Sequence, residues 1–251
     1  MFRHAIPPLL QRSARLAIGC AGAAATYSVA AASPQPAHAA WGFRSNEKSA
    51  FHVRYFDARG AMETARLLMV LGGQPFTEDR WALDFAKIGV ENMSPGMAAA
   101  RQEGKLAANL DRAPILVVDG THDIGQSKSI ERFIARRLGL FGSNDVEAAR
   151  IDSFGEHVRD IRDKYAKARN TEGEEERKRA LSGFFRDTLP EMLRLIERVC
   201  DGSGSSGAVI GKALSYADVC LYALAYALRQ SSNPLTGARV SPAHNECVSF
   251  A

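Results

Sequence analysis

From residue 51 onward, hydrophobic and polar positions follow patterns that predict short strands and helices. Residues 51–56 read Phe-His-Val-Arg-Tyr-Phe, and this period of two predicts a half-buried strand. A helix is predicted over 62–71, and the two glycines that follow it directly mark its end. Residues 77–80 suit a second short strand. The first elements are therefore strand, helix, strand.

The next stretch continues this alternation. Residues 81–111 have no clear period and are predicted as a loop with one alanine-rich helix around 97–109. An apolar run starting at Pro114 predicts a strand, and residues 122–126 predict its short partner. A helix over 127–138 follows, with its apolar residues on one face. The order β-α-β-(α)-β-β-α is typical of a thioredoxin-like domain.

The second half of the chain is predicted to be all-helical. Two segments carry apolar residues spaced alternately three and four apart, as in helices of a bundle. Between them, the charged run 172–179 predicts an exposed helix end with the i,i+4 pairs Glu174–Lys178 and Glu175–Arg179. The two apolar seams are Ile151, Phe154, Val158, Ile161 and Tyr165, and then Phe185, Leu189, Met192, Ile196 and Val199.

A capping signal precedes the last predicted helix. Ser215 and Asp218 have N-cap and N3 spacing before an apolar run, so we expect reciprocal bonds between side chain and backbone there. We therefore expect two domains. A thioredoxin-like domain spans 49–141 and an all-helical domain spans 145–251, while residues 1–48 form a separate segment.

Residues 1–48 have the composition of a targeting segment. They hold several arginines and no acid before Glu47, and an Ala/Ser/Pro-rich stretch follows the first turns. This predicts a transit peptide or a disordered segment, with import into an organelle (mitochondrion or plastid). Residues 37–39 have the small-x-small form of a signal-peptidase site, so a secretory or thylakoid-type signal is an alternative. If the segment carries no targeting signal, the protein would be cytoplasmic. The run 16–32 is too weakly apolar to predict a membrane span.

Composition and charge narrow the class of protein. Of 251 residues, 46% are hydrophobic and 24% charged, as in soluble globular proteins. The net charge is +4, but residues 1–40 contribute +3 of it, and a nearly neutral body argues against nucleic acid as a partner. The cysteines are far apart, with no CxxC pair and no histidine cluster, which predicts reduced thiols and no metal. They are Cys20, Cys200, Cys220 and Cys247.

The most informative chemistry lies around Pro114 and the Gln126–Ser127 pair. The pair opens a predicted helix, where free N–H groups and the helix dipole favour an anion, and Ser127 is a natural capping residue. Together with the run 55–60, Tyr-Phe-Asp-Ala-Arg-Gly, these motifs resemble the glutathione transferase family, in particular its sigma-like tyrosine class. The resemblance covers roughly residues 51–229. It implies an α/β thioredoxin-like N-terminal domain followed by an all-α helical bundle.

The resemblance implies roles for individual residues. Tyr55 corresponds to the catalytic tyrosine, whose hydroxyl bonds the glutathione sulfur and lowers the thiol pKa from about 8.5. Ala113, before a cis Pro114, would pair its backbone with the cysteinyl part of glutathione. Gln126 and Ser127 would hold the γ-glutamyl carboxylate. Arg59 also matches, in a role that is either structural or ligand-facing.

The resemblance also implies contacts to the amino group and to the glycyl carboxylate of glutathione, and each of these has more than one interpretation in this chain. Asp160 lies at the register from which an aspartate crosses a two-fold dimer interface to the glutathione amino group, or it is a solvated charge. The glycyl carboxylate would be held by a residue before Pro114, where this chain is about twenty residues longer than the family. The candidates for the glycyl site are Trp81, Lys87, Lys105 and Arg112.

The end of the chain departs from the family. After Arg229 the chain lacks the length and the helical period of the family's last two helices, which predicts a truncated or misread end.

The resemblance as a whole implies an enzyme that joins the glutathione thiolate to small hydrophobic electrophiles, with glutathione as co-substrate and a homodimeric assembly. Alternatives are a glutathione-dependent isomerase or peroxidase of the same fold, a non-catalytic binding or structural relative, and an unrelated thioredoxin-like scaffold.

No cysteine lies between residues 21 and 199. Thiol–disulfide exchange by a protein cysteine at the end of the first strand is thereby excluded.

Overall fold

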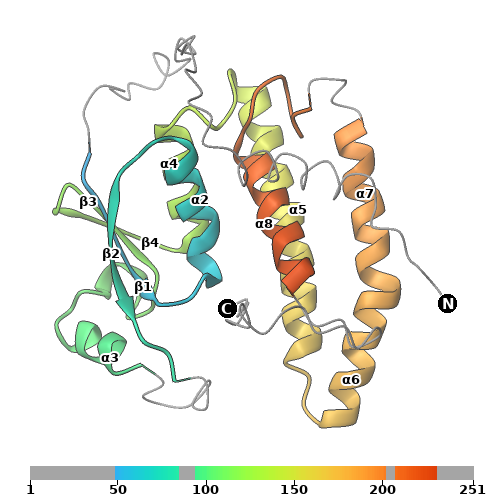
Figure 1. Cartoon of the computed structure of the whole chain (residues 1–251), viewed down its shortest axis with the longest axis horizontal. Coiled ribbons are helices and arrows are strands. Elements are labelled where there is room, and N and C mark those ends of the chain that lie inside the picture. The colour runs from blue at the N-terminus through green and yellow to red at the C-terminus, as the bar shows by residue number, and fades with distance from the viewer. Residues whose placement is uncertain (1–48, 85–93, 202–206, 231–251) are drawn as a thin grey trace, which may run out of the picture.

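A computed structural model describes residues 49–84, 94–201 and 207–230. A sheet flanked by helices and a group of long helices lie side by side (Figure 1). The predicted transit peptide and the predicted truncated end lie outside the described residues, apart from Gln230. The architecture is the expected one, a thioredoxin-like α/β domain followed by an all-helical domain.

The sheet has four strands in the order β2-β1-β3-β4. Its first strand runs parallel to β2 and antiparallel to β3, and β3 is antiparallel to β4. All four strands predicted from the sequence are present, and β1, β2 and β4 begin and end within one residue of the predicted bounds. Their bounds are β1 Phe51–Phe56, β2 Phe76–Trp81, β3 Ile115–Val118 and β4 His122–Gly125.

Helices cover both faces of the sheet. A 3₁₀ turn, Gly60–Met62, leads into α2 (Glu63–Leu71), and α2 and α4 (Ser127–Arg137) lie between the sheet and the helical domain (Figure 1). On this side Val53, Leu116 and Ile134 form part of one buried core. The opposite face carries a smaller cluster, in which Ile115 and Val117 pack with Ala100 and Leu106.

The helix on that opposite face differs from the prediction. α3 spans Pro95–Gln102 rather than 97–109, because Ser94 caps it and Pro95 stands at its first turn. It ends before Gly104, whose φ of +73° turns the chain, and only a 3₁₀ turn at Ala107–Asn109 follows.

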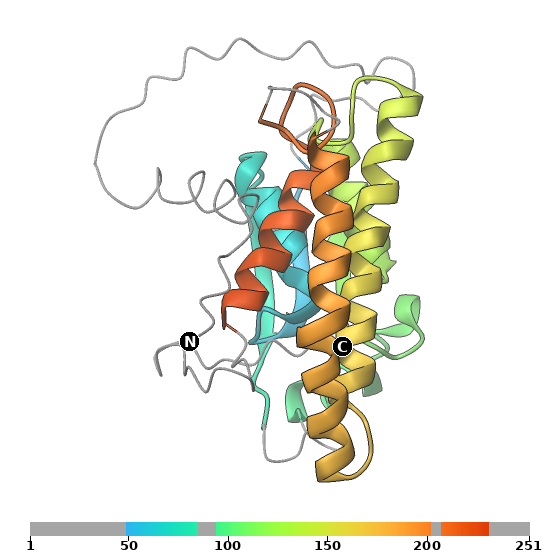
Figure 2. The same cartoon turned by 90° about the vertical axis from the view of Figure 1, so that its right-hand side faces the viewer.

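The helical domain consists of α5 (Asp145–Arg169), α6 (Glu174–Gly183), α7 (Leu189–Asp201) and α8 (Tyr216–Gln230). In the second view α5, α7 and α8 run side by side in front of the sheet (Figure 2). The α5 seam is confirmed, with Tyr165 half-buried and its other four members buried. The prediction for the second seam is wrong at its last residue, because Val199 of α7 is 37% exposed rather than buried.

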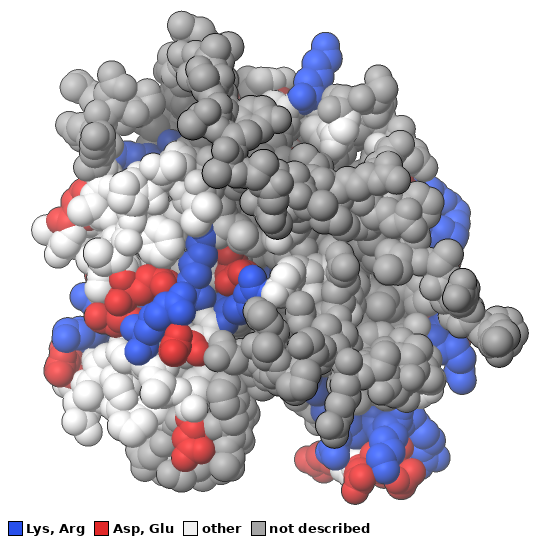
Figure 3. Space-filling model, in the orientation of Figure 1, with Lys and Arg blue, Asp and Glu red and all other residues white. Residues whose placement is uncertain are grey.

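A π-helical turn, Phe184–Thr188, joins α6 to α7 and ends two residues before Pro190. Proline lacks an N–H and its ring clashes with the carbonyl four residues earlier, so the backbone widens there. The charged end of α6 is exposed as predicted, and charges of both signs gather there (Figure 3). Lys178 pairs with Glu174 at 2.9 Å, whereas Arg179 pairs with Glu176 rather than with the predicted Glu175.

The capping signal before α8 is confirmed in one of the two expected bonds, because the Asp218 N–H bonds the Ser215 carbonyl at 3.1 Å rather than the Ser215 hydroxyl. The Asp218 carboxylate accepts the Ser215 backbone N–H at 2.9 Å. The Ser215 hydroxyl donates to the same carboxylate, and Asp218 also accepts the N–H of Val209 at 2.8 Å. Asp218 thus fixes both the start of α8 and the loop that precedes it.

Candidate functional site

The strand register brings three of the predicted site residues to one end of the sheet. Arg54 pairs with Ile115 and Ile115 pairs with Gly125. The next position along each strand is then Tyr55 on β1, Pro114 before β3 and Gln126 after β4. Residues up to 71 positions apart in the sequence therefore meet at one edge of the sheet, beside the N-terminus of α4.

Tyr55 lies at this edge with its ring in the core. Its residue is 2% exposed, and its hydroxyl accepts the N–H of Ala61 at 3.0 Å, at the turn that opens α2. Burial raises the pKa of the Tyr55 hydroxyl, while the Ala61 N–H and the positive charge of Arg66 act in the opposite direction. The hydroxyl therefore stays protonated near neutrality and can donate a hydrogen bond.

The turn before α4 has the geometry of an anion site. The Ala113–Pro114 peptide bond is cis, as the resemblance implies. Gln126 is the N-cap residue with a φ of +66°, and Ser127 is the first helical residue, so Ser127 is not the cap that the sequence predicts. The first intrahelical bond runs from Ile130 N–H to Gln126 C=O, which leaves the N–H groups of the first turn directed outward.

Asn109 completes this edge and is not among the site residues predicted from the sequence. It is 4% exposed; its Nδ2 donates to the Pro114 carbonyl at 3.1 Å, and its Oδ1 accepts from Gln126 Nε2 at 3.0 Å. It lies in a segment without periodicity, so no sequence pattern pointed to it.

Comparisons with known proteins agree with this geometry. A family model described as "Glutathione S-transferase, C-terminal domain" matches residues 159–250. The chain is 30% identical over 174 residues to "Glutathione S-transferase 2" of Onchocerca volvulus, covering 68% of this chain and 74% of that protein. It is 35% identical over 169 residues to "Glutathione S-transferase P 10" of Caenorhabditis elegans, covering 67% of this chain and 70% of that protein. This chain belongs to the glutathione S-transferase family.

A solved structure supports the same assignment. The Pi-class glutathione S-transferase of Onchocerca volvulus superposes with a TM-score of 0.57 at 28% identity, covering 72% of this chain and 77% of that one. The sheet and helices described above are thus the two domains of a glutathione transferase.

Arg59 joins the two domains of this glutathione transferase. It pairs with Glu63 at 2.7 Å, and its guanidinium stacks on the Tyr226 ring of α8 at 3.8 Å from the centroid. Arg66 is not among the predicted site residues. Its guanidinium donates to the Glu78 carboxylate at 2.6 Å and to the Ala58 carbonyl at 2.8 Å. Both arginines therefore hold the loop after β1 in place, and a contact between Arg59 and glutathione stays a prediction.

The candidates for the glycyl carboxylate fall into different surroundings. Trp81 is half-buried against Phe56, with ring centroids 6.3 Å apart, and it packs on the small core cluster. Lys105 is exposed and pairs with Glu103, and Arg112 is also exposed. Lys87 lies outside the described residues. Lys105 and Arg112 have the charge and exposure that a carboxylate site needs, and the assignment of the glycyl site to one of the four candidates stays a prediction.

Asp160 is exposed on α5 and has no hydrogen-bond or ion-pair partner in the part of the chain that the structure describes. Its neighbours on the helix differ in this respect. Asp152 and Glu156 both bind Arg132 of α4, and Asp163 lies 3.6 Å from Arg159. A contact between Asp160 and glutathione stays a prediction.

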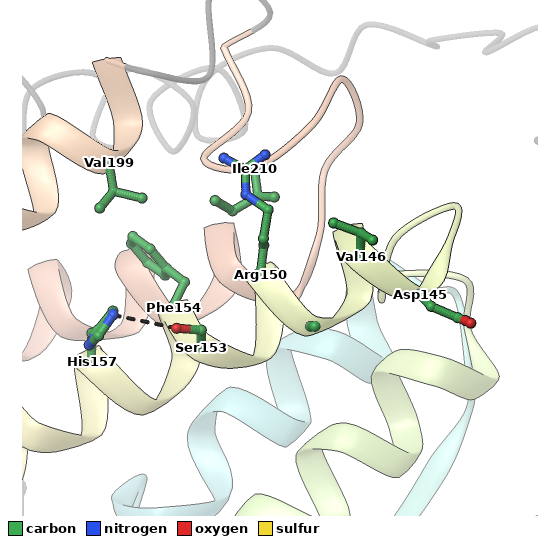
Figure 4. A pocket seen from close by; sticks show the side chains of 9 residues that line it. Asp145, Val146, Arg150, Ser153, Phe154, His157, Val199 and Ile210 are labelled. Carbon is green, nitrogen blue, oxygen red and sulfur yellow. Dashed lines mark hydrogen bonds between the residues drawn. The ribbon is translucent and has the colours of Figure 1, made fainter.

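A hollow of about 510 Å³ lies away from this edge (Figure 4). Ser153 and His157 of α5 are 3.5 Å apart there, Val199 comes from α7, and Ile210 lies before α8. None of its lining residues belongs to the glutathione site that the sequence predicts. It is a surface groove of the helical domain.

The described residues contain no group of three or more His, Cys, Asp and Glu side chains that could hold a metal ion. Within the same residues, no helix is long and apolar enough to cross a membrane. Cys220 is a free thiol on α8, and burial raises its pKa to about 12. Its thiol is therefore almost wholly protonated, and so unreactive, near neutral pH.

Proposed function

We propose that this chain conjugates the glutathione thiolate to small hydrophobic electrophiles. The observation that carries this proposal is the protonated Tyr55 hydroxyl at the edge of the sheet that also holds Pro114 and Gln126. A donor at the glutathione sulfur stabilises the thiolate relative to the thiol, whose proton passes to solvent. The thiolate then attacks the electrophile, and the new carbon–sulfur bond replaces the bond to the leaving group.

The hydroxyl of Tyr55 is well arranged for this role. It accepts a hydrogen bond from Ala61, so its own proton remains available for the sulfur. Burial raises the pKa of the hydroxyl overall, and the Ala61 N–H and the Arg66 charge offset part of that rise, so the hydroxyl keeps its proton near neutrality and can donate a hydrogen bond to the sulfur.

Substitution of Tyr55 by Phe tests the proposal. We expect Tyr55→Phe to lower turnover with an aryl-halide electrophile by about 10- to 1,000-fold, the range for loss of one positioned donor. Glutathione affinity, measured by calorimetry, should stay unchanged, since the γ-glutamyl and cysteinyl contacts remain. Because the substitution leaves the Ala61 N–H without its acceptor, the unfolding midpoint is measured in parallel. Unchanged turnover, or a wild-type protein that binds glutathione without conjugating it, would contradict the proposal.

We also propose a two-fold homodimer in which Asp160 reaches the glutathione amino group of the partner's site. Its carboxylate is exposed and has no partner among the described residues, which supports this proposal, and closed oligomers with two-fold symmetry are the commonest kind. Sedimentation should give a dimer, and Asp160→Asn should weaken glutathione binding without changing the assembly. A fully active monomer would refute this role.

Residues 1–48 are proposed to direct the protein to a mitochondrion or plastid and to be removed there. The support is their acid-free, arginine-bearing composition. A reporter fused after residue 50 should enter the organelle, whereas a version with Arg3, Arg12 and Arg15 replaced by Glu should stay in the cytosol. Cytosolic location of both would discard the proposal.

A further inference from the structure

A pair of side-chain amides connects the carbonyl of Pro114 to Gln126 through the buried Asn109. Asn109 donates from Nδ2 to the Pro114 oxygen and accepts at Oδ1 from Gln126 Nε2. A carbonyl oxygen only accepts hydrogen bonds, so Asn109 must turn its NH₂ toward Pro114. Its oxygen then faces Gln126, which must in turn present its own NH₂ to Asn109. The orientation of both amides is therefore fixed from inside the protein.

The backbone around Asn109 is built to bring it there. The two residues after it, Leu110 and Asp111, both have positive φ, at +51° and +59°, which is costly for residues other than glycine. On the other side, a Cβ at Gly125 would lie 2.6 Å from the Asn109 Cβ and 2.7 Å from the Ala108 carbonyl oxygen. A strained turn and a glycine thus accommodate one buried amide at the edge of the sheet.

We propose that Asn109 is a positioning residue that sets which atoms of Gln126 face the ligand. With Nε2 held by Asn109, the Oε1 acceptor of Gln126 is left for the ligand. An acceptor suits the ammonium group of a γ-glutamyl moiety, whereas the Ser127 hydroxyl and the first N–H groups of α4 suit its carboxylate. This inference rests on the proposed binding of glutathione at the same edge.

The proposal is tested by comparing glutathione with its des-amino analogue, in which hydrogen replaces the γ-glutamyl ammonium. Dissociation constants of both ligands are measured by calorimetry on the full chain. We expect wild type to prefer glutathione, and Asn109→Ala to reduce that preference about tenfold, the fold-change of a hydrogen bond to a charged group. The exposed Asn170, at the end of α5, supplies the matched control, and Asn170→Ala should leave both constants unchanged.

Two further variants separate positioning from a structural role. Asn109→Asp still accepts from Gln126 but cannot donate to Pro114, so it should weaken both ligands yet keep the preference for glutathione. In a Gln126→Ala background, Asn109→Ala should leave the preference unchanged, because the residue through which it acts is gone.

The outcomes are distinct from those that test the proposed function. Equal weakening of both ligands by Asn109→Ala, or an unchanged preference, would overturn the role of Asn109 while glutathione binding by wild type stood. The role would also be overturned if Asn109→Ala changed the preference for glutathione in a protein that already carries Gln126→Ala. A wild-type protein that does not bind glutathione would overturn both proposals.

Discussion

A buried hydrogen bond between Tyr216 and Glu131 joins the two domains. Tyr216 lies on α8, is fully buried, and its hydroxyl donates to Glu131 Oε2 of α4 at 2.7 Å. Glu131 is 1% exposed, and Lys128 donates to the same oxygen at 2.7 Å. Burial raises the pKa of the Tyr216 hydroxyl, so it remains a donor at all ordinary pH values. The interface between the domains thus contains a buried carboxylate oxygen that accepts hydrogen bonds from both a tyrosine and a lysine.

Tyr216→Phe removes only the hydroxyl, because the ring keeps its stacking on Phe141 at 5.7 Å between centroids. We expect the free energy of unfolding to fall by about 1.5–3 kcal/mol, the value of a buried hydrogen bond to a charged group. Glu131→Gln should cost more, about 3–5 kcal/mol, since it leaves the mostly buried Lys128 without its counter-charge. The order of the two effects is part of the prediction.

Urea denaturation of the full chain, followed by circular dichroism, measures these losses. Tyr222→Phe is the matched control on the same helix. Tyr222 is half-buried, and its hydroxyl has no hydrogen-bond partner in the described ranges, so the change should stay within about 0.5 kcal/mol. If Tyr216→Phe were no more destabilising than Tyr222→Phe, the bond would contribute nothing to the joint between the domains and the reasoning would be refuted.

Three further predictions concern the site and the start of α5. Ser127→Ala should raise the glutathione dissociation constant about tenfold, the value of one charge-assisted hydrogen bond, and equal affinity in calorimetry would remove Ser127 from the site. Gly125→Ala should weaken glutathione binding while the helical domain stays folded by circular dichroism, because the added Cβ meets Asn109 at 2.6 Å; unchanged binding would show that the edge can shift. Hydrogen bonds from the Ser143 hydroxyl and N–H lower the pKa of the Glu147 carboxyl, so its stabilising effect is present above the ordinary pKa of about 4.3 and is lost as the pH falls below it. Glu147→Gln should therefore lower the free energy of unfolding by about 1 kcal/mol at pH 7, and urea titrations should show that difference closing in acid.

The sequence determined those features that depend on neighbours along the chain. Alternation in β1, the α5 seam and the glycines after α2 predicted their elements, because strand and helix patterns are local. The acidic first turn and apolar run of α8 also predicted its start correctly. Where the pattern was weak, the prediction failed, and α3 is shorter and earlier than expected.

Only the tertiary structure decided how distant segments meet. The register of three strands aligns Tyr55 with Pro114 and Gln126, and no pattern along the chain encodes that alignment. Tertiary context also placed Gln126 rather than Ser127 at the helix cap and left Val199 partly exposed. Asn109 lies in a segment without period and gains its meaning from partners that fold against it, 5 and 17 residues away in the chain. Motif residues can be identified from the sequence because their order is local, whereas the groups that orient them depend on packing in three dimensions.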